Sequence, residues 1–537
     1  MIVILSHFFL FLALVYFNGT FFLKNIIQKN LNFNFFEIST IGLIVSLLIA
    51  QILNFFIPLN NFVIFSNLFF LIIFSLKNRF ELYIIKKEFV VILIAFTIAM
   101  LNIYGSDFSD DIDHYHLSYI INTDNTNYIW GLNNLHPLYG TSPIWLIGHS
   151  YFNFEFSRLQ DIHIFNGLIF FLFLGIFITE LKSKKINNSY YFPILFSLLV
   201  FVLLKYTRLK EFGIDRPSYL FFFISIYFYF KYLKFEKKIE YKNYLLIYTL
   251  ILLVIFFTKI IFIFFIIIPF FLFYKNINNK AYIKSILIIV LFLFSYFLKN
   301  ILISGCFFYP VYFSCVDSIP WFESKNLFEL TISAEIFNKS FPSYNGFLTS
   351  KEYIKNFVWL DTWFNRHKVE IVEFLAVTTL VLVLTLKSFK LSIKPTTNQN
   401  YFSFFTNCLI FIFFASTLIF FIKNPNIRMN HHILIILLLL LIIFFTLNKK
   451  ILINKKFFLP ILILSLCFNL MKNIQRISHL DYQNNYMKNI KHKIYIPKKN
   501  YIDNFEYFTG WIGGSPIGNQ ILKDKKFKKI SIFKIIY

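Results

Sequence analysis

The chain has 537 residues, of which 58% are hydrophobic and only 15% are charged, and its formal net charge is +25. This composition excludes a soluble globular protein, because such a fold could not cover so much apolar surface with polar groups. It also argues against a nucleic-acid partner, since most Lys and Arg residues lie in short loops between apolar runs, where positive charge sets membrane topology.

Apolar segments long enough to cross a bilayer follow one another along most of the chain. They predict an all-α polytopic membrane protein, built as a bundle of about 14 transmembrane helices (roughly 12–14). The predicted spans are residues 2–18, 39–57, 61–76, 88–104, 163–181, 190–206, 217–233, 243–257, 260–275, 284–302, 371–387, 402–422, 432–448 and 457–471.

Three regions follow from this pattern. Residues 1–87 hold the N-terminal transmembrane helices, residues 88–471 form the transmembrane core, and residues 472–537 form a C-terminal extracytoplasmic tail. The core carries two long outer loops, residues 105–162 and 303–370. The tail contains aromatic and Gly-rich patches, from which we expect a small ordered outer lobe.

The stretch 243–275 is too long for one span, and Lys259 lies at its centre. Because an isolated lysine at the bilayer midplane is costly, we expect two short helices with Thr258 and Lys259 at the turn between them. With this hairpin the short Lys-rich loops, including 387–394 and 448–456, all fall on one side. The positive-inside rule makes that side cytoplasmic and puts the long loops on the extracytoplasmic face.

The first outer loop begins YGSDFSDDIDHYHLSYI, directly after a predicted span. Its acidic and imidazole side chains belong to Asp107, Asp110, Asp111, Asp113, His114 and His116. In a helix that starts near Asp111, Asp113 and His116 share a face at i,i+3 spacing. Such a cluster at a membrane surface suits a general base, a metal site with Asp111, Asp113 and His116 as ligands, or both. The alternative is a solvated helix N-terminus, which explains one or two aspartates better than four.

The same loop continues WGLNNLHPLYGTSPIWLIGHSYF, which places His136 shortly before a predicted helix. We expect a cap at Thr141 or Ser142, with Pro143 in the first turn. The stretch 144–154 has the pattern of an amphipathic interfacial helix that lies along the membrane surface. His136 is either a site residue or a structural loop histidine.

Later loops bring further charged residues to the same outer face: Asp215, Arg216, Lys259 and Arg428. Cations at membrane depth without acidic partners would bind a phosphate well, and the alternative is that they snorkel to lipid headgroups. In the loop SGCFFYPVYFSC, Cys306 and Cys315 could close a disulfide in an oxidising compartment.

The order of a span, an Asp-rich outer loop, an interfacial helix and further spans resembles the GT-C superfamily of glycosyltransferases. More closely, the chain resembles an uncharacterised bacterial family of predicted polytopic membrane proteins first named from a Leptospira member. The motifs that carry this resemblance are D-x-x-x-Y-H-L (111–117), G-L-x-N-L-H (131–136), an Asp before a span (Asp215), a Lys between short helices (Lys259), S-G-x-x-x-Y-P (304–310), and an Arg after a Pro (Pro425, Arg428).

This resemblance implies a GT-C-like fold and transfer of a sugar from a polyprenyl-phosphate-linked donor to a cell-envelope glycan or lipid acceptor. The base would be Asp111 or Asp113, with Asp110 behind them, because the extra aspartates leave the choice open. Residues that would bind the donor phosphate or lipid are His116, His136, Asp215, Arg216, Lys259 and Arg428. Some GT-C enzymes need a divalent cation, Mg or Mn, and others do not.

Two other functions fit a chain of this kind. A transporter or flippase of lipid-linked glycan would favour mid-span charges that face a central cavity, whereas here nearly all charges lie at span ends. An O-antigen-type polymerase or ligase would depend on a late outer loop with several arginines, and the 303–370 loop contains only Arg366. The expected location is a bacterial inner membrane, with the active site facing the periplasm.

Overall fold

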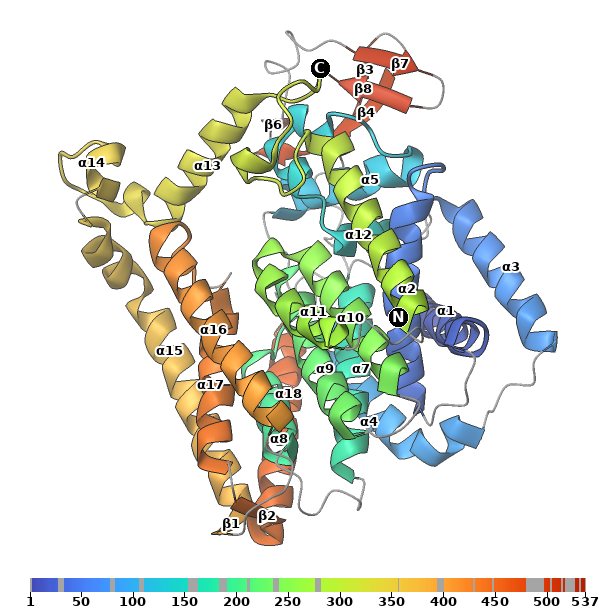
Figure 1. The fold of residues 1–537 in the computed structure, drawn as a ribbon, viewed down its shortest axis with the longest axis vertical. Coiled ribbons are helices and arrows are strands. Elements are labelled where there is room, and N and C mark those ends of the chain that lie inside the picture. Colours follow the sequence, from blue (N-terminus) through green and yellow to red (C-terminus); the bar gives the residue numbers. More distant parts are fainter. Residues whose placement is uncertain are drawn as a thin grey trace.

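The computed structural model describes residues 2–536 apart from short gaps, and helices dominate the part that it describes (Figure 1). The gaps are residues 28–32, 78–82, 106–110, 153–162, 183–190, 210–212, 235–240, 276–281, 356, 394–399, 428–429, 447–448, 480–496, 503–504, 513–514, 517–526 and 531–532.

The helices follow the chain in this order. The first half forms α1 (Ile2–Phe21), α2 (Phe35–Leu53), α3 (Asn61–Lys77), α4 (Tyr83–Tyr104), α5 (Leu117–Asn125), α6 (Ile144–Tyr151), α7 (Ile164–Lys182), α8 (Tyr191–Lys205) and α9 (Asp215–Lys234). The second half forms α10 (Tyr241–Thr258), α11 (Ile267–Tyr274), α12 (Ile283–Ser304), α13 (Ser324–Asn338), α14 (Ser350–Lys355), α15 (Trp359–Ser388), α16 (Asn400–Ile422), α17 (His431–Thr446) and α18 (Lys455–Ser478).

Each predicted span overlaps one of these helices. Within the described residues, seven helices are long and apolar enough to cross a membrane, and six further apolar helices are shorter. The chain is therefore a largely helical, multi-pass membrane protein. The predicted count of fourteen spans is not confirmed, because helices such as α8, with 15 residues, and α17, with 16, fall short of the ~20 residues that the hydrocarbon requires.

The N-terminal helices α1 and α2 cross at a pair of glycines. A Cβ atom added at Gly42 would lie 1.6 Å from the carbonyl oxygen of Val15, and one added at Gly19 would lie 2.0 Å from the carbonyl oxygen of Ile38. Small residues let membrane helices pack backbone against backbone. This crossing fixes the position of α2. Helix α2 in turn packs against α6 and α7.

The hairpin around Lys259 has the form that the sequence predicts. Helix α10 ends at Thr258, Lys259 is extended with a φ of −142°, and a 3₁₀-helix over Ile260–Ile266 leads into α11. This 3₁₀-helix packs back against α10. The chain thus reverses at Lys259, which puts its ammonium group at a helix end.

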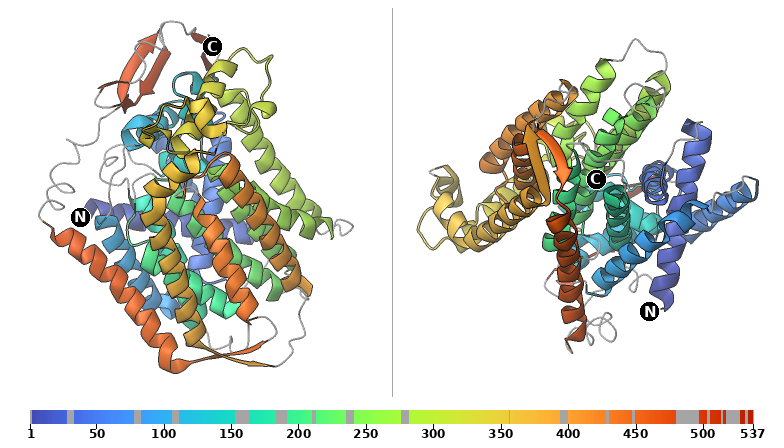
Figure 2. Two further views of the ribbon diagram at one scale, coloured as in Figure 1. Left: turned by 90° about the vertical axis from the view of Figure 1, so that its left-hand side faces the viewer. Right: turned by 90° about the horizontal axis from the view of Figure 1, so that it is seen from below.

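Two of the predicted cytoplasmic loops pair with each other. Strand β1 (Phe389–Ile393) follows α15, strand β2 (Lys449–Ile453) precedes α18, and they form an antiparallel ladder with Lys390 opposite Leu452. The ladder lies at one end of the molecule (Figures 1 and 2). Both loops therefore lie on the same side of the helix bundle, which agrees with their common Lys-rich composition.

The opposite end holds α5, α13 and the strands of the C-terminal tail (Figures 1 and 2). These strands are β3 (Lys498–Ile502), β4 (Phe505–Thr509), β5 (Trp511–Ile512), β6 (Ser515–Pro516), β7 (Phe527–Ile530) and β8 (Phe533–Ile536), paired in three short hairpins. The backbone N–H of Trp130 donates to the carbonyl of Lys534 at 2.8 Å, and the backbone N–H of Ile536 donates to the carbonyl of Trp130 at 2.9 Å. The expected outer lobe thus exists as β-structure that is tied to the first outer loop.

The expectation of an amphipathic interfacial helix at 144–154 is wrong. Helix α6 spans eight residues, all of them buried, and it packs against α2, α5 and α10. It begins after Pro143, which occupies the N-cap position without a side-chain cap, and Ser142 before it has a φ of +29°. The aromatic and aliphatic side chains that suggested a membrane-facing side contact neighbouring helices instead.

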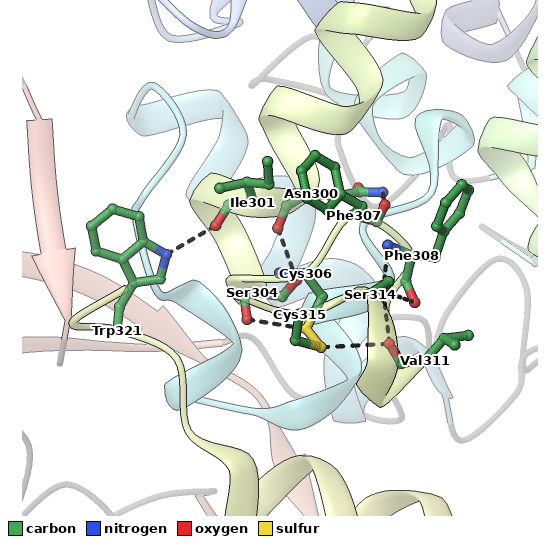
Figure 3. Close-up of a disulfide and its surroundings, with 10 residues drawn as sticks. All are labelled: Asn300, Ile301, Ser304, Cys306, Phe307, Phe308, Val311, Ser314, Cys315 and Trp321. Carbon is green, nitrogen blue, oxygen red and sulfur yellow. Dashed lines mark hydrogen bonds between the residues drawn. A yellow bond between two sulfur atoms is a disulfide. The ribbon is translucent and has the colours of Figure 1, made fainter. Parts of the chain in front are cut away.

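The loop after α12 is closed by a disulfide between Cys306 and Cys315 (Figure 3). Around it, the Asn300 amide donates to the carbonyl of Phe307 at 2.9 Å, and the indole N–H of Trp321 donates to the carbonyl of Ile301 at 2.9 Å. These bonds hold the loop against the outer end of α12.

The two-sided arrangement predicts the outcome of cysteine labelling with a membrane-impermeant maleimide. Thr141→Cys and Glu352→Cys, both at exposed positions, should react in intact cells, and Lys390→Cys in β1 should react only after permeabilisation. The free cysteines Cys408 and Cys467 are first replaced by Ser. Equal labelling of Thr141→Cys and Lys390→Cys in intact cells would contradict the arrangement.

Candidate functional site

A cavity of about 130 Å³ lies where the ends of α8, α9 and α17 meet. Its lining residues are Asn166, Lys205, Tyr206, Gly213, Asp215, Arg216, Tyr219 and His431. Two cations and one carboxylate face the cavity, so its lining carries a positive excess. A small anionic group is the chemical class that such a lining favours.

Asp215 and Lys259 form an ion pair beside this cavity. Asp215 is the first residue of α9, where the helix dipole favours a carboxylate, and its Oδ1 lies 2.8 Å from Nζ of Lys259. The two side chains are only 16% and 10% exposed, and Nζ also lies 5.2 Å from the centroid of the Tyr219 ring. The expectation that Lys259 lacks an acidic partner is therefore wrong, because α9 supplies one from 44 residues earlier.

Arg216 has hydrogen-bonding capacity left over. Its guanidinium faces the cavity, and its buried Nη1 has no hydrogen-bond partner among the residues that the structure describes. Arg208 and Arg476 lie within electrostatic range of it. A buried N–H group without a partner costs about 1–3 kcal/mol, so a ligand oxygen at this position would be stabilising.

Arg476 lies near the cavity, bonded to Thr207, although the sequence assigned it to the tail. It lies in the last turn of α18, and it donates to both the carbonyl and the hydroxyl of Thr207, the latter at 3.1 Å. Lys205 at the end of α8 pairs with Glu373 of α15, with Nζ and Oε1 2.6 Å apart. Had the last span been predicted to extend beyond residue 471, its basic end would have placed Arg476 near the ends of the other helices at the cavity.

His431 and its neighbour His432 begin α17 on the far side of the cavity. The His431 ring lies 5.7 Å from that of Tyr219 and 4.5 Å from that of Phe374, measured between centroids. His432 is fully buried against Phe262 of the hairpin. Arg428, the sequence candidate in this loop, lies outside the described residues.

The acidic segment forms a different kind of helix from the one expected. Ile112–His116 is a π-helix, so the i,i+3 argument for a shared face of Asp113 and His116 does not apply to this turn. Asp111 and Asp113 are half-buried, and His116 is 2% exposed. Asp110 lies outside the described residues. Single-turn π-helices are frequent at functional sites.

The proposed metal ligands do not form a recognisable centre. Among the described residues, no group of three or more His, Cys, Asp or Glu side chains is arranged to hold a metal ion. A site built from Asp111, Asp113 and His116 therefore gains no support from this geometry.

His136 is positioned as a neutral side chain. It caps the 3₁₀-helix Pro137–Thr141, where its Nδ1 accepts from the Leu138 N–H at 3.3 Å, and its ring stacks on Tyr115 with centroids 6.3 Å apart. Burial lowers the pKa of His136 to about 4, with a smaller contribution from the neighbouring His114. At neutral pH it can hydrogen-bond to a substrate, but it offers no positive charge to a phosphate.

Helix α6 lies between the acidic segment and the cavity, because it packs against α5 and its Trp145 side chain bonds to Asn166 of the cavity lining. His149 of α6 forms a side-chain hydrogen bond with Asn166 and lies within electrostatic range of His116. Asn166 also accepts from the Trp145 indole N–H at 2.7 Å, and it lines the cavity. The two candidate regions are thus separated by α6 and the helices packed against it.

The C-terminal tail covers the acidic segment. A Cβ atom added at Gly510 would lie 2.3 Å from the carbonyl oxygen of Asp113 and 2.1 Å from that of His114, so the tail touches this backbone directly. Nearby, the side chain of Asn122 bonds to both the carbonyl and the N–H of Phe508, at 2.8 and 3.0 Å. The backbone of the acidic segment is therefore packed directly against the tail.

The Asp215–Lys259 pair predicts a specific pattern of stability. Asp215→Asn or Lys259→Met alone should lower the free energy of unfolding by about 3 kcal/mol, because each leaves a buried charge without its partner, and the double variant should recover most of this loss. Unfolding in mixed micelles, followed by tryptophan fluorescence, measures it. Lys499→Met is the control, since its pair with Glu506 is 47% and 33% exposed and worth about 0–1 kcal/mol. If the two single variants lose no more free energy of unfolding than Lys499→Met does, the pairing would be contradicted.

No curated protein and no solved structure matches this chain. One family model does, with the description "Domain of unknown function (DUF8201)", and it covers residues 1–435. The matched part includes the acidic segment, the hairpin of Lys259 and the start of α17, whereas Arg476 and the tail lie beyond it. Because the match extends over more than half of the chain, the protein belongs to this DUF8201 family.

Proposed function

We propose that the protein is a membrane glycosyltransferase of the GT-C type, which moves a sugar from a polyprenyl-phosphate-linked donor to a cell-envelope glycan or lipid acceptor on the extracytoplasmic face. The observation that carries this proposal is the cationic cavity with the buried Arg216 Nη1, which α6 separates from the acidic segment. One region suits a phosphate and the other suits a base, and glycosyl transfer from a lipid phosphate needs both.

In the proposed reaction the acceptor oxygen attacks the anomeric carbon of the donor sugar. The bond between that carbon and the phosphate oxygen breaks, the acceptor proton passes to Asp113 or Asp111, and the lipid phosphate leaves with the bonding electrons. Arg216 and Lys205 would stabilise the charge that develops on the leaving phosphate. The Asp215–Lys259 pair would hold the hairpin and α9 in place around this charge.

The transporter or flippase alternative receives less support. Helix α9 carries its ion pairs at its two ends: Asp215 pairs with Lys259 at one end, and Lys231 pairs with Glu37 at the other. Glu37 is only 1% exposed. A transporter would favour charges that face an open central cavity, whereas the Lys231–Glu37 pair is buried among packed side chains.

Arg216 should govern donor binding whichever sugar the donor carries. A polyprenyl monophosphate is the probe, because it retains the lipid and phosphate common to all such donors. Arg216→Gln should weaken its binding about 10-fold or more, since a hydrogen bond to a charged group is worth about 1.5–3 kcal/mol. Native mass spectrometry or fluorescence titration in nanodiscs measures the dissociation constant. Lys528→Gln, which removes the same charge from an exposed tail strand, is the control, and equal affinities in both variants would exclude a phosphate at Arg216.

The base is tested by transfer itself. Asp113→Asn and Asp111→Asn are assayed for transfer of radiolabelled sugar from polyprenyl-phosphate sugars in nanodiscs. Loss of the base should lower kcat about 10²–10⁴-fold while binding of the polyprenyl monophosphate persists. Asp317→Asn, at an exposed position of the second outer loop, should leave kcat unchanged. Full activity in both acidic-segment variants would refute the base assignment.

A further inference from the structure

The chain between α13 and α15, together with the first turns of α15, exposes large apolar side chains. We call residues 339–355 and 357–368 the α14 lobe. Phe347 is fully exposed, Phe357 is 66% exposed and Phe364 is 53% exposed. Leu360, in the first turn of α15, is 40% exposed. Folded proteins rarely leave such a group of large side chains in water, and those that do use it for an interaction.

These side chains are held outward by a small core of their own. Tyr353, Trp359 and Trp363 are buried together beneath them, and the Tyr353 hydroxyl donates to the carbonyl of Lys339 at 2.7 Å. The space under the lobe is therefore already filled, so Phe347 and Phe357 have no buried position to which they could return.

The lobe lies at the level where the apolar helices end. The Trp363 ring packs on Phe420, with centroids 5.7 Å apart, and its indole N–H donates to the carbonyl of Pro425 at 2.6 Å. Phe420 belongs to the last turn of α16, a membrane-spanning candidate that ends at Ile422. Phe364, the next residue along α15, is thus level with the outer edge of the hydrocarbon.

The exposed apolar face continues from the lobe down α15. Val369 and Val372 are 74% and 64% exposed on this helix, which has 30 residues and is therefore about 45 Å long. The hydrocarbon core measures about 30 Å, so the first turns of α15 lie in the headgroup region. Helix α14 projects outward beside the upper ends of α15 and α16, beyond the helix bundle (Figures 1 and 2). The part of the chain around α14 therefore projects beyond the helix bundle, on the side where α15 exposes apolar residues (Figure 1).

The charges around these side chains suit a lipid surface. Lys351 and Lys355 are both exposed on α14 at i,i+4 spacing, which puts them on one face, and Arg366 and Lys368 are exposed on α15. The exposed acids of the same segment are Glu352 and Asp361. The net positive charge beside apolar side chains is the combination that binds anionic phospholipid headgroups.

We infer that residues 347–355 and 357–368 bind the surface of the extracytoplasmic leaflet of a bilayer that contains anionic phospholipid. Phe347 and Phe357 enter the acyl-chain boundary, and Lys351 and Lys355 contact lipid phosphates. This segment acts as a peripheral anchor in addition to the membrane-spanning helices, and it does not depend on the proposed glycosyl transfer.

Spin labelling tests the inference on the full-length protein. Cys408→Ser and Cys467→Ser remove the free thiols, and a nitroxide is attached to Phe347→Cys in nanodiscs with anionic phospholipid. Power saturation compares collisions with oxygen, which concentrates in lipid, and with a nickel chelate, which stays in water. The oxygen-to-nickel ratio at position 347 should be several-fold higher than at Tyr501→Cys, a 62% exposed aromatic position on β3.

The other possible outcomes distinguish contact with the bilayer from exposure to water and from contact with a protein partner. A label at position 347 that is as accessible to nickel as the one at position 501 would overturn the inference, because the segment would then lie in water. Protection from both reagents would overturn it too, since a protein partner would be covering the lobe. A second variant, Lys351→Glu with Lys355→Glu, should abolish the difference in ratio between anionic and zwitterionic nanodiscs, and a persistent difference would exclude these lysines as lipid contacts.

Discussion

Helix α9 carries an ion pair at each end, and the rest of the core is arranged around it. Asp215 at its start pairs with Lys259 of the hairpin, and Lys231 in its last turn pairs with Glu37 of α2. Single charges inside hydrocarbon are costly, so these pairs fix how far α9 can slide along its axis and which helices lie beside it. The cationic cavity forms at the first of these two ends, and it owes its position to that restraint.

The sequence located the helices well because hydrophobic length is a local property. The same reasoning identified the turn at Lys259, since a lone central lysine makes a single long span improbable. Its partner Asp215 could not be read in this way, because the pairing joins residues that meet only after α9 and α10 have packed. Arg476 was missed because its helix is more polar at the end, so that the predicted span stopped at residue 471, whereas α18 continues to Ser478 and reaches Thr207.

The local sequence pattern gave wrong predictions at two places where other parts of the chain, and not solvent or lipid, surround a segment. Helix α6 has the alternation of an interfacial helix, but α2, α5 and α10 surround it. The acidic segment reads as an α-helix start, yet the backbone forms a π-helix that the tail covers at Gly510. In both places the surrounding chain comes from far away in the sequence, and hydropathy carries no information about it.

The contact between Asn122 and Phe508 joins residues 386 positions apart. During synthesis the acidic segment therefore leaves the ribosome long before the strands that cover it. Until those last strands are made, the backbone around Asp113 lacks the neighbour that Gly510 provides. Assembly of the tail hairpins is consequently a late step of biogenesis, and a ribosome that stalls after α18 would leave a helix bundle without the strands that cover its acidic segment.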